Sequence, residues 1–204
     1  MRVAVTGTPG VGKTTATEQI EYPVVHLNDA VRTEGLTDGH DDERDSLVVD
    51  LDAAASYVAE REAAVGADDG DDDPAGAVGA DDGDDDPAGA VGADDGDEQS
   101  VLVVESHLAH QLPADRVVVL RCRPDVIEQR LLDRGETEAT AAENRESEAL
   151  DLIVSEAVDR HGEDSVYEID ATDAAPAETA ASIEAVIAGE REPSAGEVSF
   201  LQYR

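Results

Sequence analysis

The sequence predicts an α/β fold in which a parallel sheet of about five strands carries helices on both faces. Two observations support this prediction: short buried-strand patterns alternate with helical patterns, and a glycine-rich turn joins the first strand to the first helix. Strands that alternate with helices form right-handed crossover units, which cover both faces of a parallel sheet. About 170 residues lie outside a repetitive acidic segment, enough for a single domain spanning residues 1–204.

The predicted strands are short apolar runs, most of them rich in valine, and they lie at Arg2–Thr6, Val24–Leu27, Val101–Glu105, Val117–Arg121 and Val166–Ile169. The predicted helices have apolar residues at helical spacing, and they lie at Thr14–Ile20, Asp52–Val65, Asp125–Arg134, Ala139–Arg160 and Pro176–Ala188. The first helix follows a glycine turn, and the third ends in arginine and glycine. In such sheets ligands bind beyond the carboxyl ends of the strands.

The turn after the first strand fits the phosphate-binding P-loop pattern G-x-x-x-x-G-K-[ST] at every specified position, from Gly7 to Thr14. Successive backbone N–H groups of such a loop form an anion site at the start of the next helix. Lys13 is the only lysine in the chain, and it would meet the β- and γ-phosphates. The Thr14 hydroxyl would bind Mg²⁺. The motif therefore predicts a P-loop NTPase three-layer sandwich that binds ATP or GTP.

The chain is strongly acidic, with 50 acidic and 14 basic residues and a formal charge of −36. Molar salt shortens the Debye length to about 3 Å, which screens this self-repulsion. The composition is typical of proteins from halophilic archaea that accumulate salt. A single cysteine favours a reducing cytoplasm, the absence of a long apolar run argues against a membrane, and the acidic surface argues against strong direct nucleic-acid binding.

Residues 66–98 form a tandem acidic repeat with a period of 13 residues, in which the copy at 66–78 recurs identically at 79–91. Removing its 14 acidic residues from the charge of −36 still leaves −22, so the acidity is distributed along the whole chain. Alanine and valine are its only apolar residues, too few to bury a core, so we expect a disordered insert. A calcium site is a weaker interpretation, because the spacing of an EF-hand loop is absent.

Several polar residues near strand ends are candidates for the site. Glu105 ends an apolar strand, the arrangement of a Walker B acid that holds Mg²⁺, and capping of a strand is the alternative. His107 could orient a water or phosphate, or be structural. Arg134, beside a glycine, could stabilise charge on a transferred phosphoryl group. Arg32 could bind an acceptor phosphate, and solvent exposure is the competing interpretation. Arg130 could reach phosphate or pair with a nearby acid.

These stretches resemble the adenylate kinase isoenzyme 6 type of P-loop kinase/ATPase. The matching segments are GTPGVGKTT at Gly7–Thr15, the region of Asp29, Arg32, Leu36 and Asp38-Gly39, Glu105–His107, Val117–Gly135 and Glu143–Ala157. The resemblance implies that ATP phosphates are bound by Gly10, Gly12, Lys13, Thr14 and Thr15. It also implies an acceptor-binding region at about 26–49, with Asp29 and Arg32 as substrate-binding candidates, and a lid at about 133–143 with Arg134 as its arginine.

The resemblance implies a broad-specificity nucleoside monophosphate kinase that uses Mg²⁺ and ATP to phosphorylate AMP, with ATPase activity. It also implies a role in maturation of the small ribosomal subunit and its rRNA, through a platform ribosomal protein. The alternative is an ATP-hydrolysing assembly factor with little AMP kinase activity, in which His107 positions water. The chain departs from the family pattern at Glu105, where an aspartate is usual, and at Glu136, where an aromatic residue is usual.

Overall fold

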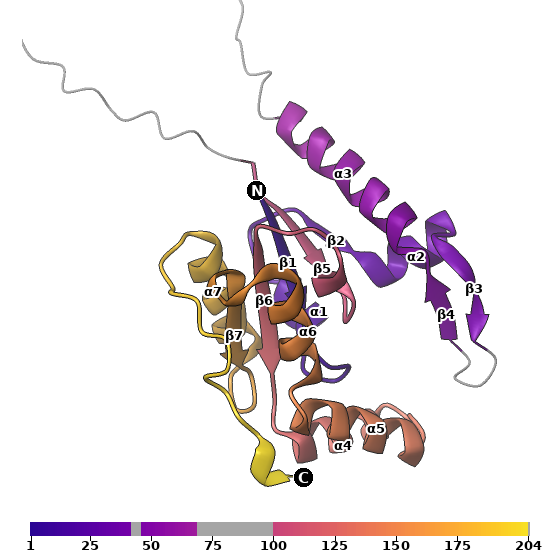
Figure 1. Cartoon of the computed structure of the whole chain (residues 1–204), viewed down its shortest axis with the longest axis vertical. Coiled ribbons are helices and arrows are strands. Elements are labelled where there is room, and N and C mark those ends of the chain that lie inside the picture. The colour runs from indigo at the N-terminus through magenta and orange to yellow at the C-terminus, as the bar shows by residue number, and fades with distance from the viewer. Residues whose placement is uncertain (42–45, 69–99, 204) are drawn as a thin grey trace, which may run out of the picture.

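The computed structural model describes residues 1–41, 46–68 and 100–203, and a sheet of five parallel strands lies at its centre (Figure 1). The strands follow the order β2-β5-β1-β6-β7. Their bounds are Arg2–Thr6 for β1, Val24–His26 for β2, Leu102–Glu105 for β5, Arg116–Arg121 for β6 and Val166–Asp170 for β7. The predicted parallel α/β sandwich is confirmed, and the P-loop follows its central strand.

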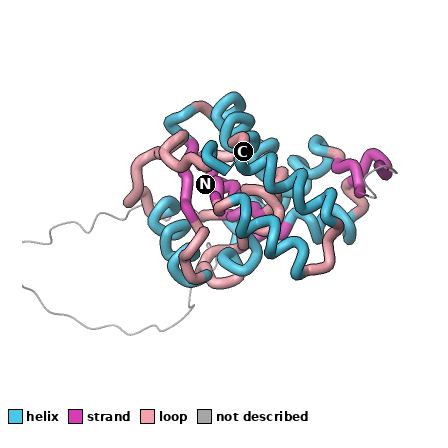
Figure 2. Tube along the Cα trace, turned by 90° about the horizontal axis from the view of Figure 1, so that it is seen from below, coloured by secondary structure: helices cyan, strands magenta, loops and turns pink. Residues whose placement is uncertain are grey.

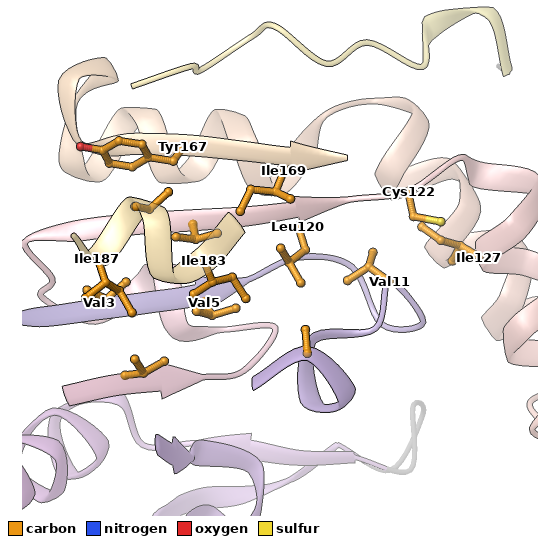
Figure 3. Close-up of a cluster of buried hydrophobic side chains, with 14 of the residues drawn as sticks. Val3, Val5, Val11, Leu120, Cys122, Ile127, Tyr167, Ile169, Ile183 and Ile187 are labelled. Carbon is orange, nitrogen blue, oxygen red and sulfur yellow. The ribbon is translucent and has the colours of Figure 1, made fainter. Parts of the chain in front are cut away.

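Alternate residues of β1 point to opposite faces of the sheet, which creates two hydrophobic cores. Val3 and Val5 pack with α1 (Lys13–Thr17) and α7 (Pro176–Ile187), as the labelled side chains in Figure 3 show for α7. Ala4 belongs to the second core, which contains side chains from α2 (Leu27–Glu34), α3 (Leu51–Asp68) and α6 (Leu152–His161). In Figure 2 the magenta strands of the sheet accordingly lie between cyan helices.

The segment after β2 forms structure that the sequence patterns did not predict. The predicted strand Val24–Leu27 ends one residue early, because Leu27 begins α2 and its side chain is buried in the second core. An antiparallel hairpin follows, formed by β3 (Thr37–Asp41) and β4 (Ser46–Val49). Its polar sequence lacks an apolar run long enough to indicate a strand. The hairpin and α3 extend from one side of the sheet (Figure 1).

The predicted single helix Ala139–Arg160 is wrong, because the chain forms two helices there: α5 (Glu138–Ala149) and α6. Asp151 lies between them with φ 55°, in the left-handed region that interrupts a helix. Its carboxylate accepts a hydrogen bond from Arg121, 2.5 Å away, which ties the break to the core. No glycine or proline marks the position, so the helical pattern alone gave no signal.

The remaining helix bounds differ from the predictions mainly at their ends. The helix α1 stops at Thr17, three residues before the predicted Ile20. By contrast, α3 continues to Asp68 and so includes the first three residues of the predicted insert, while residues 69–98 lie outside the described residues. The helix α4 (Pro124–Asp133) matches its prediction closely, and short 3-10 turns occur at Ala109–Gln111, Glu163–Ser165 and Leu201–Tyr203. Across the described ranges, every helix is too short or too polar to cross a membrane.

Candidate functional site

The P-loop connects β1 to α1 at the carboxyl edge of the sheet, and its glycines have the positive φ angles that it needs. Gly7 has φ 139°, and a Cβ there would lie 2.4 Å from the carbonyl oxygen of Leu120 on the neighbouring strand. Gly12 has φ 105° and lies directly before the first residue of α1. Side chains are therefore excluded by close packing at the first position and by backbone conformation at the second.

Lys13 is held against the inner side of this loop. Its Nζ donates hydrogen bonds to the carbonyl oxygens of Gly7, at 2.8 Å, and Thr8, at 3.4 Å, and only 8% of the residue is exposed. Burial lowers the pKa of Lys13 to about 8, although Glu105 and Glu148 act in the opposite direction. A polyphosphate would supply the negative charge that this buried ammonium needs.

Glu105 and Thr14 bring two oxygen ligands together beside Lys13. The Thr14 hydroxyl donates to Glu105 Oε2 at 3.3 Å, and His26 Nδ1 lies 2.9 Å from the same oxygen. Glu105 ends β5 and is 3% exposed. Mg²⁺ prefers oxygen ligands and usually takes only one or two from the protein, with phosphates and water supplying the others. The residues therefore fit Mg²⁺, and His26 is a partner of Glu105 that sequence patterns did not reveal.

A cavity of about 190 Å³, here named the P-loop hollow, collects most of the predicted site residues. Its lining comes from the P-loop, the start of α1, α2, the end of β5 with the segment after it, and the connection after α4: Pro9, Gly10, Gly12, Lys13, Thr14, Thr15, Asn28, Glu105, His107 and Arg134. Arg134 reaches it from the end of α4 and is an exposed residue. Four segments that are far apart in the sequence thus meet around one polar cavity.

His107 lines this hollow together with the loop glycines. Burial lowers its pKa to about 4, and the positive charge of Lys13 acts in the same direction. The imidazole is therefore neutral at neutral pH and can donate or accept a hydrogen bond. His110 has a different environment: it is 1% exposed, with Nδ1 3.0 Å from the Thr6 hydroxyl and Nε2 2.9 Å from Glu156. Its contacts are those of a structural histidine.

A second cavity of about 390 Å³, here named the α2 hollow, adjoins the first. Its lining comes from α2, the hairpin and the segment after β5: Asn28, Val31, Arg32, His40, Leu47, Val49, His107 and Leu108. Asn28 and His107 line both hollows, so they mark the boundary between them. Asn28 was not recognised from sequence. Its Oδ1 accepts from the Ser106 hydroxyl at 2.9 Å, which leaves the amide nitrogen to donate elsewhere.

The structure separates the two substrate-binding candidates. Arg32 lines the α2 hollow, whereas Asp29 lines a different groove between α2 and α3. The two side chains form an exposed ion pair of 3.5 Å. Arg130, for which phosphate contact was one prediction, instead donates to the carbonyl oxygens of Gly10 and Val11, each at 3.3 Å. Arg130 therefore binds the P-loop backbone.

Comparisons with known proteins agree with this architecture. A family model described as an AAA domain matches residues 3–151. A protein of Natronomonas pharaonis named "Putative adenylate kinase" is 52% identical, and the alignment covers 100% of this chain and 99% of the relative. Proteins of the same name from Halobacterium salinarum and Methanosarcina acetivorans are 47% and 32% identical, over 100% and 92% of this chain and 99% and 86% of the relatives. The chain belongs to the adenylate kinase isoenzyme 6 type family of P-loop proteins that its sequence resembles.

Proposed function

We propose that this protein is a nucleoside monophosphate kinase that transfers the γ-phosphoryl group of ATP to AMP or another nucleoside monophosphate. The observation that carries the proposal is the pair of adjoining hollows. One contains the P-loop, the other contains Arg32, and they share only Asn28 and His107. A transferase needs such a boundary, because donor and acceptor must meet in line with water excluded.

The side chains around the boundary have different roles in the proposed reaction. Lys13 and Arg134 bind the phosphoryl oxygens on which charge develops, and Arg32 binds the acceptor phosphate. Thr14 and Glu105 would hold Mg²⁺, which neutralises phosphate charge when bound. Neutral His107 and the Asn28 amide orient the acceptor oxygen through hydrogen bonds. No covalent enzyme intermediate is required.

The direct test is ADP formation from ATP and AMP in molar KCl. High salt is needed because the charge of −36 calls for screening, and this acidity is also our reason for proposing a halophilic setting. The single cysteine is our reason for proposing a cytoplasmic one. We expect ADP production to require AMP and to saturate with it. ATP hydrolysis at a rate that AMP does not change would contradict the proposal. A panel of other nucleoside monophosphates then measures how broad the specificity is.

We also propose ATPase activity, supported by His107 at the boundary, where it could orient water when no acceptor is bound. A role in small-subunit maturation, through a platform ribosomal protein, is supported by family resemblance alone. Co-sedimentation with precursor small subunits tests this role. Binding that is lost in Lys13→Ala would support nucleotide-dependent assembly, and equal binding by the variant would contradict it.

A further inference from the structure

A buried carboxylate outside both hollows is attached directly to the P-loop. Glu148 lies near the end of α5 and is 3% exposed. Its Oε2 accepts a hydrogen bond of 2.5 Å from the hydroxyl of Thr8, the second residue of the loop. Its Oε1 accepts from Arg121 Nε at 2.7 Å and from the backbone N–H of Cys122 at 3.2 Å. Both carboxylate oxygens are thus committed to donors.

Arg121 holds Glu148 in place and binds two further carboxylates. The guanidinium is 1% exposed and also donates to the carboxylates of Asp151 and Glu168. The ring of Phe200 lies against it, with the guanidinium carbon 5.5 Å from the ring centroid. Buried charges of this kind require partners on every side, so the arrangement is rigid.

The same contacts reach the helices that carry the lid arginine. Asp151 forms the break after α5, and α5 packs antiparallel against α4 (Figure 1). Arg134 lies in the short connection between these two helices. The end of α5 is therefore bonded to Arg121, and through Glu148 to the P-loop, which lines the P-loop hollow together with Arg134.

Thr8 is the point where this network can affect nucleotide binding. Its carbonyl oxygen accepts from Lys13 Nζ, while its side chain donates to Glu148. Thr8 therefore contacts Lys13 through its carbonyl oxygen and Glu148 through its hydroxyl. We propose that Glu148 is a positioning residue, which sets the P-loop backbone and Lys13 for the nucleotide and couples the loop to the helix pair that carries Arg134.

The proposal predicts that removing the hydrogen bond between Thr8 and Glu148 lowers the affinity for Mg-ATP selectively. Thr8→Val keeps the shape of the side chain and removes only the hydroxyl, so the pairing of Glu148 with Arg121 remains. We expect affinity for Mg-ATP, measured by calorimetry, to fall on the order of tenfold, because a buried hydrogen bond to a charged group is lost. The KM for AMP should stay unchanged, because Thr8 does not line the α2 hollow.

A double-mutant cycle separates positioning from independent effects. Glu148→Gln should lower Mg-ATP affinity at least as much, because it also weakens the pairing with Arg121, and the Thr8→Val/Glu148→Gln double variant should lose little more than Glu148→Gln alone. Glu146→Gln is the matched control, because it makes the same charge change at an exposed site on the same helix. Affinity losses that multiply in the double variant, or wild-type affinity in Thr8→Val, would overturn the proposal.

Cys122 gives a test that excludes general loosening of the core. It is the only cysteine, it is fully buried, and its backbone donates to Glu148. In Thr8→Val, labelling of this thiol under native conditions should stay as slow as in the wild type, whereas in Glu148→Gln it should accelerate. Fast labelling in Thr8→Val would show that its weaker binding is structural, and the proposal would fail. This inference builds on the proposed function only for the AMP measurement; Mg-ATP binding and thiol labelling remain informative if the protein phosphorylates no acceptor.

Discussion

The two hollows of the site are built by different kinds of contact. Around the P-loop, Lys13 and Glu105 are buried, and the loop is bound by side chains from α4 and α5, more than a hundred residues away in sequence. Around the α2 hollow, the Arg32 side chain is 69% exposed, and its ion-pair partner in the described part of the chain is its helical neighbour Asp29. The P-loop hollow is therefore preorganised, whereas the α2 hollow depends on local structure.

This difference has a functional consequence. Fixed donors stabilise developing charge without reorganisation, which suits the part of the site where bonds change. Lining formed largely by one helix and a hairpin, with the Leu47 side chain exposed, can adjust to different acceptors. We therefore expect substitutions around the P-loop to abolish or slow the reaction, and substitutions around α2 mainly to change acceptor affinity.

The largest loss is expected from Lys13→Ala. The substitution removes the only buried ammonium of the described site, which should lower turnover by about 10³-fold or more, as for other preorganised charge-stabilising groups. The thermal midpoint should change little, because the lysine is held by two loop carbonyls rather than by an ion pair. Coupled-assay rates and melting curves measured in the same buffer check both statements. Turnover within tenfold of the wild type would mean that the loop does not hold the transferred phosphate.

Arg134→Ala should come next, with turnover reduced by about 10²-fold and ATP affinity reduced far less. In the proposed reaction the guanidinium would face charge that grows in the transition state, so the ground-state complex would depend on it weakly. Arg123→Ala is the matched control, since Arg123 lies at the other end of α4 and pairs with Asp125 on the surface. Equal effects of the two substitutions would argue against a lid role for Arg134.

Arg32→Ala tests whether the α2 hollow binds the acceptor. Loss of a charge-assisted phosphate contact should raise the KM for AMP by about thirtyfold and leave the KM for ATP nearly unchanged. Arg61→Ala offers a control, because Arg61 stacks on Tyr57 in the separate groove beside α3. If ATP affinity falls instead, the α2 hollow is not the acceptor site.

The pH dependence should separate the two hollows further. The pKa of Lys13 is lowered to about 8 by burial, so kcat/KM for Mg-ATP, which reports the free enzyme, should fall about tenfold over one unit above that value. Over the same range, the free energy of unfolding should rise with pH, because the unfolded chain binds the Lys13 proton more tightly than the folded chain does. Protonation of His107, with its pKa lowered to about 4, should leave no inflection near neutral pH. An inflection near the ordinary histidine pKa that disappears in His107→Gln would contradict its neutral state.

The sequence predicted the P-loop segment and the strands around it well and the structure around the α2 hollow poorly, for physical reasons. A P-loop has a fixed local spacing, and apolar runs such as Val117–Arg121 identify the strands that carry it. Asn28, His26 and Glu148 gave no signal, because their roles depend on side chains brought together from other strands and helices. The break at Asp151 was missed for the same reason, since a long-range contact with Arg121 stabilises it.

The smallest effect is expected from removing the acidic repeat. A carbon added at Gly66, near the end of α3, would lie 3.2 Å from the Ser100 hydroxyl, so the segment leaves and rejoins the described structure at neighbouring points. Ser100 is held there by the N-terminal ammonium, which donates to its carbonyl oxygen at 2.7 Å. Replacing residues 69–98 by a short glycine-serine link should therefore change turnover less than twofold and stability by no more than about 1 kcal/mol, the scale of loop-closure entropy. The repeat joins α3 to β5, and the described residues that line the two hollows lie outside it. A large loss of activity with the fold preserved would therefore contradict this prediction and show that the acidic segment itself contributes to nucleotide binding.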